Sequence, residues 1–272
     1  MTNKGKIVLV TGAGGSVGSE ICRQVAAQEP ARILLFDNSE LALYNIDREL
    51  SHVAPVTPIL GDVSQLADVC EVFERKIDVV YHAAAYKHVT MVQKNQRVAE
   101  RVNVRGTALL TRHARATGVP AFVLVSTDKA VNPSCTMGAT KAQAEDITRA
   151  AGYTVVRFGN VRDSSGSVLP LFKEQLARGG PLTVTHPSAT RYFMSIKQAA
   201  NLAITTSAFP PGTYVLDMGE PVRIDDIANG MVAGTDIKIR YIGLRPGEKM
   251  HEELFRGVPR KIDYPGILED VL

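Results

Sequence analysis

Short apolar runs and longer amphipathic segments alternate along the first 160 residues. Six runs are almost continuously apolar: residues 6–11, 32–36, 56–60, 77–83, 121–126 and 153–158. A run without polar alternation is typical of a strand that is covered on both faces. The segments between the runs have the length of helices. The pattern therefore predicts an α/β fold of the Rossmann type, a doubly wound parallel sheet with helices on both faces.

The rhythm changes after residue 160, where glycines and prolines become frequent. A helix is predicted over residues 196–208, and short strands over 213–217 and 237–241. We divide the chain into a Rossmann domain, residues 1–160, and a small C-terminal lobe, residues 161–272. The lobe is expected to be interleaved with the sheet and to pack beside the carboxyl ends of the strands.

Composition narrows the class of protein. With 45% hydrophobic and 22% charged residues, the chain is an ordinary globular protein. Its net charge of +3 and the lack of any run of Lys or Arg argue against nucleic-acid binding. The first predicted strand starts almost at the N-terminus, and no apolar stretch approaches ~18 residues, so we expect neither a signal peptide nor a membrane span.

The cysteines and histidines give no sign of a metal site. Cys22, Cys70 and Cys135 are far apart and form no CxxC pair, which argues against disulfides and zinc and fits a reducing cytoplasm. His82 and His88 lack a carboxylate partner at ligand spacing. We expect them to be ordinary neighbours of a pocket.

A glycine-rich turn follows the first predicted strand. The spacing TGxxGxxG places Gly12, Gly15 and Gly18 between this strand and an amphipathic helix. In such a turn the backbone around Ser16 and Val17 approaches a pyrophosphate, and the positive end of the helix dipole stabilises it. A plain structural turn is the alternative.

Acidic and small residues follow the next strands. Asp37 lies about 20 residues after the glycine turn, where its carboxylate would accept hydrogen bonds from the adenosine ribose of NAD and repel the 2′-phosphate of NADP. Asp62, beside Val63, is placed to meet the adenine amine. Ala83 and Ala84 let the backbone pass close to the cofactor. Capping roles for the two aspartates are the alternative.

The segment 126–141 reads STDKAVNPSCTMGATK. A lysine four residues after a tyrosine would indicate a hydride-transferring enzyme, but Met137 stands four residues before Lys141, and methionine cannot move a proton. Asp128 and Lys129 offer an acid and a base at the end of the fifth predicted strand, the edge where an open α/β sheet places its reactive groups. A solvated turn is the alternative reading.

The combined motifs resemble a known enzyme family. They are TGAGGSVGSEICRQ, LLFDNSELALYNIDREL, VVYHAAAYKHV, VSTDKAVNPSCTMGATKA, RFGNVRDSSGSVLPLF, VTHPSATRYFMSI, VLDMGEPVRIDDIA and GLRPGEK. The chain resembles the nucleotide-sugar 4,6-dehydratases of the short-chain dehydrogenase/reductase superfamily, and more narrowly the capsule and polysaccharide branch acting on UDP-N-acetylglucosamine. Two features depart from that branch: an N-terminal membrane region of its longer members does not occur here, and residues 233–235 form a shorter connection than expected.

The resemblance implies a three-step reaction. NAD takes a hydride from C4 of the sugar, water is lost across C5 and C6, and the hydride returns to C6. Asp128 is then the acid that protonates the C6 hydroxyl, Lys129 the base for the C5 hydrogen, and Thr127 a partner of the C4 hydroxyl. Lys141 holds the nicotinamide ribose, and Met137 replaces the usual tyrosine, as in the longer-chain branch.

These roles set conditions on two protonation states. The pKa of Asp128 has to rise and that of Lys129 has to fall, which partial burial achieves, whereas an ion pair between them favours both charged forms. We therefore predict that the two side chains point at different atoms of the sugar and do not pair. The group that accepts the C4 hydroxyl proton is left open among Thr127, Asp128, Lys129 and water.

The lobe is expected to bind the UDP-sugar. Arg245 and Arg191 are candidates for the diphosphate, Glu248 for the uridine ribose, and Asn160 and Lys87 for the sugar side. We expect a homo-oligomer, a dimer or higher, since superfamily members commonly pair through the helices that correspond to residues 99–117 and 137–151.

Two other functions fit the same residues. One is a 4-epimerase, or a dehydratase of another nucleotide- or nucleoside-linked sugar, with the fold and cofactor unchanged. The other is a non-catalytic NAD-binding sensor. The acid and base at the strand end argue against a sensor, which has no need of them.

Overall fold

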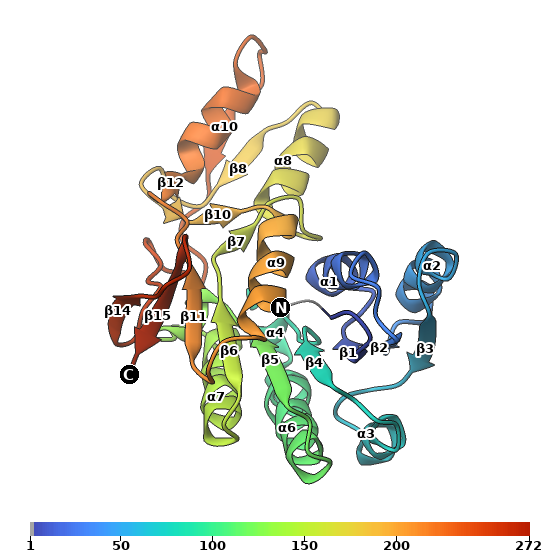
Figure 1. Ribbon diagram of the computed structural model, residues 1–272. Coiled ribbons are helices and arrows are strands. Elements are labelled where there is room, and N and C mark those ends of the chain that lie inside the picture. The colour runs from blue at the N-terminus through green and yellow to red at the C-terminus, as the bar shows by residue number, and fades with distance from the viewer. Residues whose placement is uncertain (1–2) are drawn as a thin grey trace.

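The computed structural model describes residues 3–272, which form a nine-stranded sheet with helices on both faces and a smaller lobe at one end (Figure 1). The strand order is β14-β15-β11-β6-β5-β4-β1-β2-β3, parallel except for β15 and β14. The strands are β1 (Ile7–Thr11), β2 (Arg32–Asp37), β3 (Val56–Leu60), β4 (Val79–His82), β5 (Ala121–Val125), β6 (Thr154–Arg157), β11 (Thr213–Leu216), β14 (Val258–Lys261) and β15 (Ile267–Val271). The predicted Rossmann-type α/β fold and its six strands are confirmed.

Two apolar cores lie on opposite faces of the sheet. Val8 and Val10 of β1 face one core, and Leu9 between them faces the other. Since successive side chains of a strand point to opposite faces, a strand buried on both sides has to be apolar throughout. The first core contains α1 (Ser16–Ala26), α2 (Glu40–Leu50) and α9 (Ile196–Thr206); the second contains α3 (Leu66–Phe73), α6 (Thr107–Ala116) and α7 (Thr136–Ala150).

The lobe begins where the chain leaves the carboxyl end of β6. It has a small core of its own around Phe172 and Leu182, and Figure 1 shows α8, β8 and α10 beyond the end of the sheet. Its elements are β7 (Asn160–Val161), α8 (Val168–Ala177), β8 (Leu182–Val184), β9 (Thr190–Arg191), β10 (Phe193–Met194), β12 (Val222–Arg223), α10 (Ile224–Val232) and β13 (Ile239–Tyr241). Within residues 3–272, no helix combines the length and the apolar character that crossing a membrane requires.

The chain returns to the sheet twice after residue 160. Helix α9 and strand β11 return first, close to the predicted ranges 196–208 and 213–217. Strands β14 and β15 then form an antiparallel edge that the sequence pattern did not predict. The sequence VPRK of β14 contains no apolar run, and all four residues are exposed, which explains why periodicity missed it.

A buried arginine connects the last strand to the middle of the sheet. Arg157 of β6 is fully buried, and its guanidinium contacts Glu145 of α7, with Nε–Oε1 2.8 Å and Nη2–Oε2 2.6 Å, and also Asp270 of β15. Ser126 Oγ donates to Glu145 Oε1 at 2.6 Å, and Asp270 accepts from the backbone N–H of Gly257 at 2.7 Å. These partners offset the cost of removing three charges from water.

Replacing one member of this network is expected to destabilise the fold strongly. Glu145→Gln leaves the buried Arg157 with one carboxylate and should lower the free energy of unfolding by about 3–5 kcal/mol, as measured by urea unfolding. Glu174→Gln on α8, which removes an exposed ion pair with Arg178 just after that helix, is the control and should have little effect. Equal stabilities of the two variants would contradict this account.

Candidate active site

The glycine turn between β1 and α1 lets two backbone segments touch. Gly12 has φ +67°, and a Cβ added there would lie 2.7 Å from the backbone N of Ala84. A Cβ on Gly18 would lie 1.9 Å from the carbonyl oxygen of Gly12. Only glycine fits at these positions. The first N–H groups of α1, including those of Ser16 and Val17, have no partner within the helix and are available to a pyrophosphate.

Asp37 lies at the end of β2 against this turn. Its Oδ2 accepts from Gly14 N at 2.9 Å, and its Oδ1 accepts from Ser39 N at 2.9 Å. Asp37 does not cap α2, because the N-cap of that helix is Ser39. Each carboxylate oxygen can accept a second hydrogen bond, so the contacts that a ribose needs are still available.

An open cleft of about 240 Å³ runs along the turn. Its lining combines the glycine turn with the ends of β2, β3 and β4: Gly12, Gly14, Gly15, Phe36, Asp37, Asn38, Ser39, Ala42, Gly61, Val63, Ala83, Ala84, Ala85, Tyr86 and Val102. Asp62 lies between two lining residues, and its Oδ1 accepts from Ser64 N at 2.8 Å. The shape and the donors of this cleft fit a dinucleotide.

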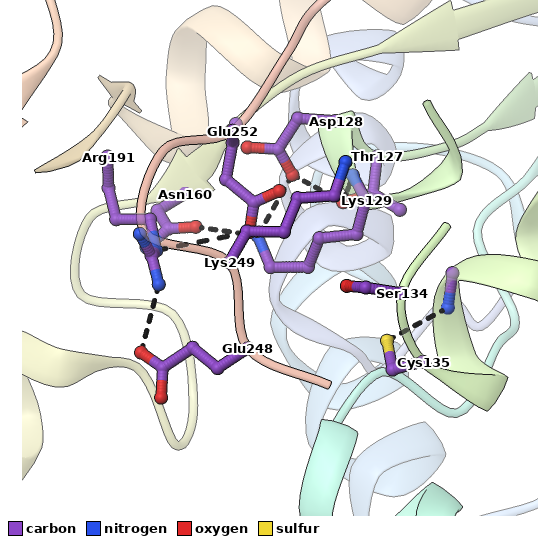
Figure 2. Close-up of polar contacts among 12 residues, drawn as sticks. Thr127, Asp128, Lys129, Ser134, Cys135, Asn160, Arg191, Glu248, Lys249 and Glu252 are labelled. Atoms are coloured by element: carbon purple, nitrogen blue, oxygen red, sulfur yellow. Dashed lines mark hydrogen bonds and ion pairs between the residues drawn. The ribbon is translucent and has the colours of Figure 1, made fainter. Parts of the chain in front are cut away.

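Thr127, Asp128 and Lys129 follow β5 and begin a single 3₁₀ turn, Asp128–Ala130 (Figure 2). Asp128 is fully buried. Thr127 Oγ1 donates to Asp128 Oδ1 at 2.9 Å and accepts from Lys129 N at 3.4 Å. The other carboxylate oxygen, Oδ2, is buried without a hydrogen-bond partner among residues 3–272. A buried polar atom left free in this way is common at functional sites.

Asp128 and Lys129 form an ion pair, so the prediction that they do not pair is wrong. Lys129 Nζ lies 2.9 Å from Asp128 Oδ1, 3.3 Å from Asn160 Oδ1 and 3.5 Å from Glu252 Oε1. The two residues are adjacent on one tight turn. A carboxylate buried as completely as that of Asp128 is stabilised by the nearest cation, because leaving it uncompensated is costly.

The direction expected for the pKa of Lys129 is also wrong. Burial lowers this pKa, as expected, and the positive charge of Arg191 lowers it further. The negative charges of Asp128 and Glu252 outweigh both effects and raise the pKa of Lys129 above its usual value. Charge pairing, which depends on tertiary contacts, thus prevails over burial at this residue.

Lys141 and Met137 lie one helical turn apart on α7, and both are buried. The ammonium of Lys141 donates to the carbonyl oxygen of Val125 at 2.7 Å. Burial lowers the pKa of Lys141 to about 8, against a smaller opposite effect of Glu145. Met137 packs in an apolar cluster with Val92, at the base of α4 (Val89–Lys94).

Two of the predicted substrate residues are bound to each other. Arg191 Nη2 lies 2.9 Å from Glu248 Oε1, and the arginine is nearly buried. Arg245 is exposed in the same loop as Glu248, three residues before it, and its backbone N–H donates to Glu248 Oε2 at 3.2 Å. Asn160 Oδ1 accepts a hydrogen bond from Lys129 Nζ at 3.3 Å. Burial lowers the pKa of Lys87, which lies after β4.

The imidazole of His82 connects β1 to α6 through two threonine side chains. Its Nδ1 lies 2.7 Å from Thr11 Oγ1, and its Nε2 lies 3.0 Å from Thr107 Oγ1. Burial lowers the pKa of His82 to about 3, with a further contribution from the charge of Lys141, so the ring is neutral. Across residues 3–272, no three His, Cys, Asp or Glu side chains gather as a metal-binding group.

Sequence reasoning missed Asn103 and Glu252. Asn103 lies in a π-helical stretch, Glu100–Gly106, that follows α5 (Gln96–Ala99) inside the helix predicted over residues 99–117. Its Oδ1 accepts from Tyr86 N at 2.8 Å, and its Nδ2 donates to Tyr86 O at 3.0 Å, which fixes one wall of the cleft. Glu252 lies in a segment without any periodic signal. Only the tertiary fold brings it to Lys129.

Comparison with known proteins places the chain in a family. The model of the family described as polysaccharide biosynthesis protein matches residues 8–267. The chain is 46% identical to the capsular polysaccharide biosynthesis protein CapD of Staphylococcus aureus, over 93% of this chain and 45% of that protein, so it spans less than half of this relative. It is 30% identical to the UDP-N-acetylglucosamine 4,6-dehydratase (inverting) of Campylobacter jejuni subsp. jejuni, over 91% of this chain and 77% of that protein.

A UDP-glucose 4-epimerase of Rickettsia akari is 32% identical, over 92% of this chain and 77% of the epimerase. Among solved structures, that of Pen from Bacillus thuringiensis has a TM-score of 0.91 and 32% identity, covering 99% of this chain and 89% of Pen. The dTDP-glucose 4,6-dehydratase DesIV of Streptomyces venezuelae, solved with NAD bound, has a TM-score of 0.79 at 22% identity, covering 91% of this chain and 88% of DesIV, and shares the fold.

A family model that covers almost the whole chain agrees with relatives of 30–46% identity. The chain belongs to the polysaccharide biosynthesis protein family, within the nucleotide-sugar dehydratases and epimerases of the short-chain dehydrogenase/reductase superfamily.

Proposed function

We propose that the chain catalyses the NAD-dependent 4,6-dehydration of a UDP-sugar, most plainly UDP-N-acetylglucosamine, to its 4-keto-6-deoxy product. The observation that carries this proposal is the Thr127–Asp128–Lys129 group at the end of β5, in which the Asp128 carboxylate is fully buried and paired with Lys129. An elimination needs an acid and a base, and this group offers both at the end of β5, the strand that pairs with β4. The dehydratase of C. jejuni among the relatives supports the same reaction.

The cleft along the glycine turn is the proposed NAD site. Gly12, Gly15 and Gly18 allow the pyrophosphate to approach the N-terminus of α1, and the Asp37 carboxylate favours a free ribose over a 2′-phosphate. Lys141 on α7 is the proposed partner of the nicotinamide ribose, with ammonium protons to donate besides the one that Val125 O accepts. When bound, NAD supplies the hydride acceptor for C4 and the hydride donor for C6.

The hydrogen bond from Thr127 to Asp128 offers a route for the C4 hydroxyl proton. As that hydroxyl is oxidised, its proton passes to Thr127 Oγ1, and Thr127 passes its own proton to Asp128 Oδ1, 2.9 Å away. Asp128 then gives the proton to the departing C6 hydroxyl, which leaves as water. Asp128 ends as it began, and no tyrosine is needed.

Lys129 is the proposed base at C5. The C4 ketone acidifies the C5 hydrogen, so a neutral lysine can remove it, and the ammonium later returns a proton to C5. The neighbouring carboxylates favour the ammonium form, and the side chain is 21% exposed. Lys129 therefore loses its proton to solvent before this step, and turnover rises with pH.

A 4-epimerase is the second candidate, because the relatives include UDP-glucose 4-epimerases. Both reactions begin with oxidation at C4. An epimerase returns the hydride to C4 and requires no acid for C6 and no base for C5. Asp128 would still take up the C4 hydroxyl proton in that reaction, but Lys129 would have no C5 hydrogen to remove and Asp128 no C6 hydroxyl to protonate.

The direct test is incubation of the protein with UDP-sugars and NAD, followed by mass spectrometry. We expect a product lighter by one water, with deuterium from D₂O at C5 and no net consumption of NAD. A product of unchanged mass and altered C4 configuration would instead establish the epimerase.

Substitutions of the acid and the base should abolish most of the activity. Asp128→Asn and Lys129→Ala are expected to lower kcat by about 10²–10⁴-fold, while titration calorimetry shows unchanged NAD binding. Asp226→Asn on α10, whose side chain is 62% exposed, is the matched control and should leave kcat unaltered. Near-normal turnover of both site variants would show that the roles are misassigned.

Met137→Ala should reduce kcat far less than Asp128→Asn, because methionine takes no part in proton transfer and fills an apolar cluster. The expected loss is about tenfold or smaller, from loosened packing beneath Lys141. Steady-state kinetics of the two variants in parallel make the comparison. A loss as large as that of Asp128→Asn would assign Met137 a direct role.

A further inference from the structure

Glu252 is a buried carboxylate that the proposed reaction leaves without a task. Its side chain is 3% exposed, and Oε1 lies 3.5 Å from Lys129 Nζ and 4.0 Å from Arg191 Nε. Oε2 is buried and has no hydrogen-bond partner among residues 3–272. Burying a carboxylate with a free oxygen is costly. An unsatisfied carboxylate this close to Lys129 therefore indicates that Glu252 acts on the lysine.

The segment that carries Glu252, residues 249–253, is held by hydrogen bonds to the chain just after Lys129 and to β9. Lys249 Nζ donates to Val131 O at 2.9 Å, and Glu253 Oε2 accepts from Asn132 Nδ2 at 2.8 Å. Thr190 N donates to Met250 O at 3.1 Å on the side of β9. The position of Glu252 is therefore set by its own segment and not by Lys129.

Arg191 is not the main ionic partner of Glu252. Its guanidinium already has Glu248 at 2.9 Å and the carbonyl oxygens of Thr190 and Met250 at 2.7 and 3.1 Å. The distance of 4.0 Å to Glu252 is the longest of these contacts. The closer cation to Glu252 is Lys129.

Three oxygens surround the ammonium of Lys129, those of Asp128, Asn160 and Glu252, and an ammonium has three protons to donate. The positive charge of Arg191 acts in the opposite direction to the two carboxylates and lowers the pKa of Lys129. When Asp128 takes up the C4 proton in the proposed reaction, it becomes neutral. Glu252 is then the carboxylate that still faces Lys129.

We propose that Glu252 is a positioning residue for Lys129: it holds the lysine at the reaction centre and sets the pH at which the lysine loses its proton. The proposal rests on the proposed function for its consequence in turnover, but the contact itself can be tested without a substrate. After Lys129 removes the C5 proton, the nearby negative charge stabilises the ammonium that results.

The test measures how fast Lys129 reacts with acetic anhydride at pH 8 in the NAD-loaded protein, by peptide mass spectrometry. Only neutral lysine reacts, so the rate reports the pKa. Glu252→Gln removes one facing charge, and the rate at Lys129 should rise about tenfold. Lys76, whose side chain is 79% exposed, is the internal reference and should not change.

Two further variants separate charge from structure. Glu253→Gln changes a 54% exposed neighbour that can still accept from Asn132, and it should leave the rate at Lys129 as in the parent protein. Glu252→Asp keeps the negative charge but moves it away from Lys129, because the side chain is one methylene shorter. The acetylation rate at Lys129 should then rise by less than in Glu252→Gln. If the Gln variant does not fold, the Asp variant carries the test. No rise at Lys129 in either variant overturns the proposal.

Turnover gives the second measurement. If Lys129 acts when neutral, Glu252→Gln moves the acidic limb of kcat about one pH unit lower, with KM nearly unchanged, whereas a merely structural defect lowers kcat at every pH. If Glu252→Gln speeds acetylation of Lys129 but the parent protein dehydrates no UDP-sugar, the proposed function is refuted and the Glu252–Lys129 contact stands. Dehydration with an unshifted limb would refute the role of Glu252 alone.

Discussion

The buried guanidinium of Arg157 is the contact on which the arrangement of the site depends. It joins Glu145 of α7 to Asp270 of β15, and its Nη1 also donates to the carbonyl oxygen of Leu254 at 3.5 Å. Ser126, which hydrogen-bonds Glu145, directly precedes the strand-end group. Leu254 lies two residues after Glu252. One buried cation therefore fixes both segments that meet at Lys129.

The two buried charge clusters differ in how well their atoms are satisfied. In the first, the carboxylates of Glu145 and Asp270 accept hydrogen bonds from side chains and backbone, which suits a structural role. In the second, one oxygen of Asp128 and one of Glu252 remain without partners among residues 3–272. Unsatisfied buried polar atoms cost stability, and the proposed acid–base reaction would account for two of them around Lys129.

The methionine at position 137 becomes understandable in this setting. The usual tyrosine accepts a proton from the C4 hydroxyl, and here a hydrogen bond from Thr127 to Asp128 offers that proton a path to the group that needs it in the next step. In the proposed reaction the same aspartate serves oxidation and elimination. Met137 needs no part in proton transfer there and packs in an apolar cluster with Val92.

The sequence by itself determined the Rossmann fold, the glycine cleft and the Thr127–Asp128–Lys129 group, because apolar strands, tight turns and strand ends are local patterns. It did not determine the pairing of Asp128 with Lys129 or the raised pKa of that lysine. The pairing follows from the burial of Asp128, and the raised pKa follows from Asp128 together with Glu252, which is more than a hundred residues away in the sequence. Charges brought together by the fold leave no local periodic signal, and only the tertiary structure decides how they pair.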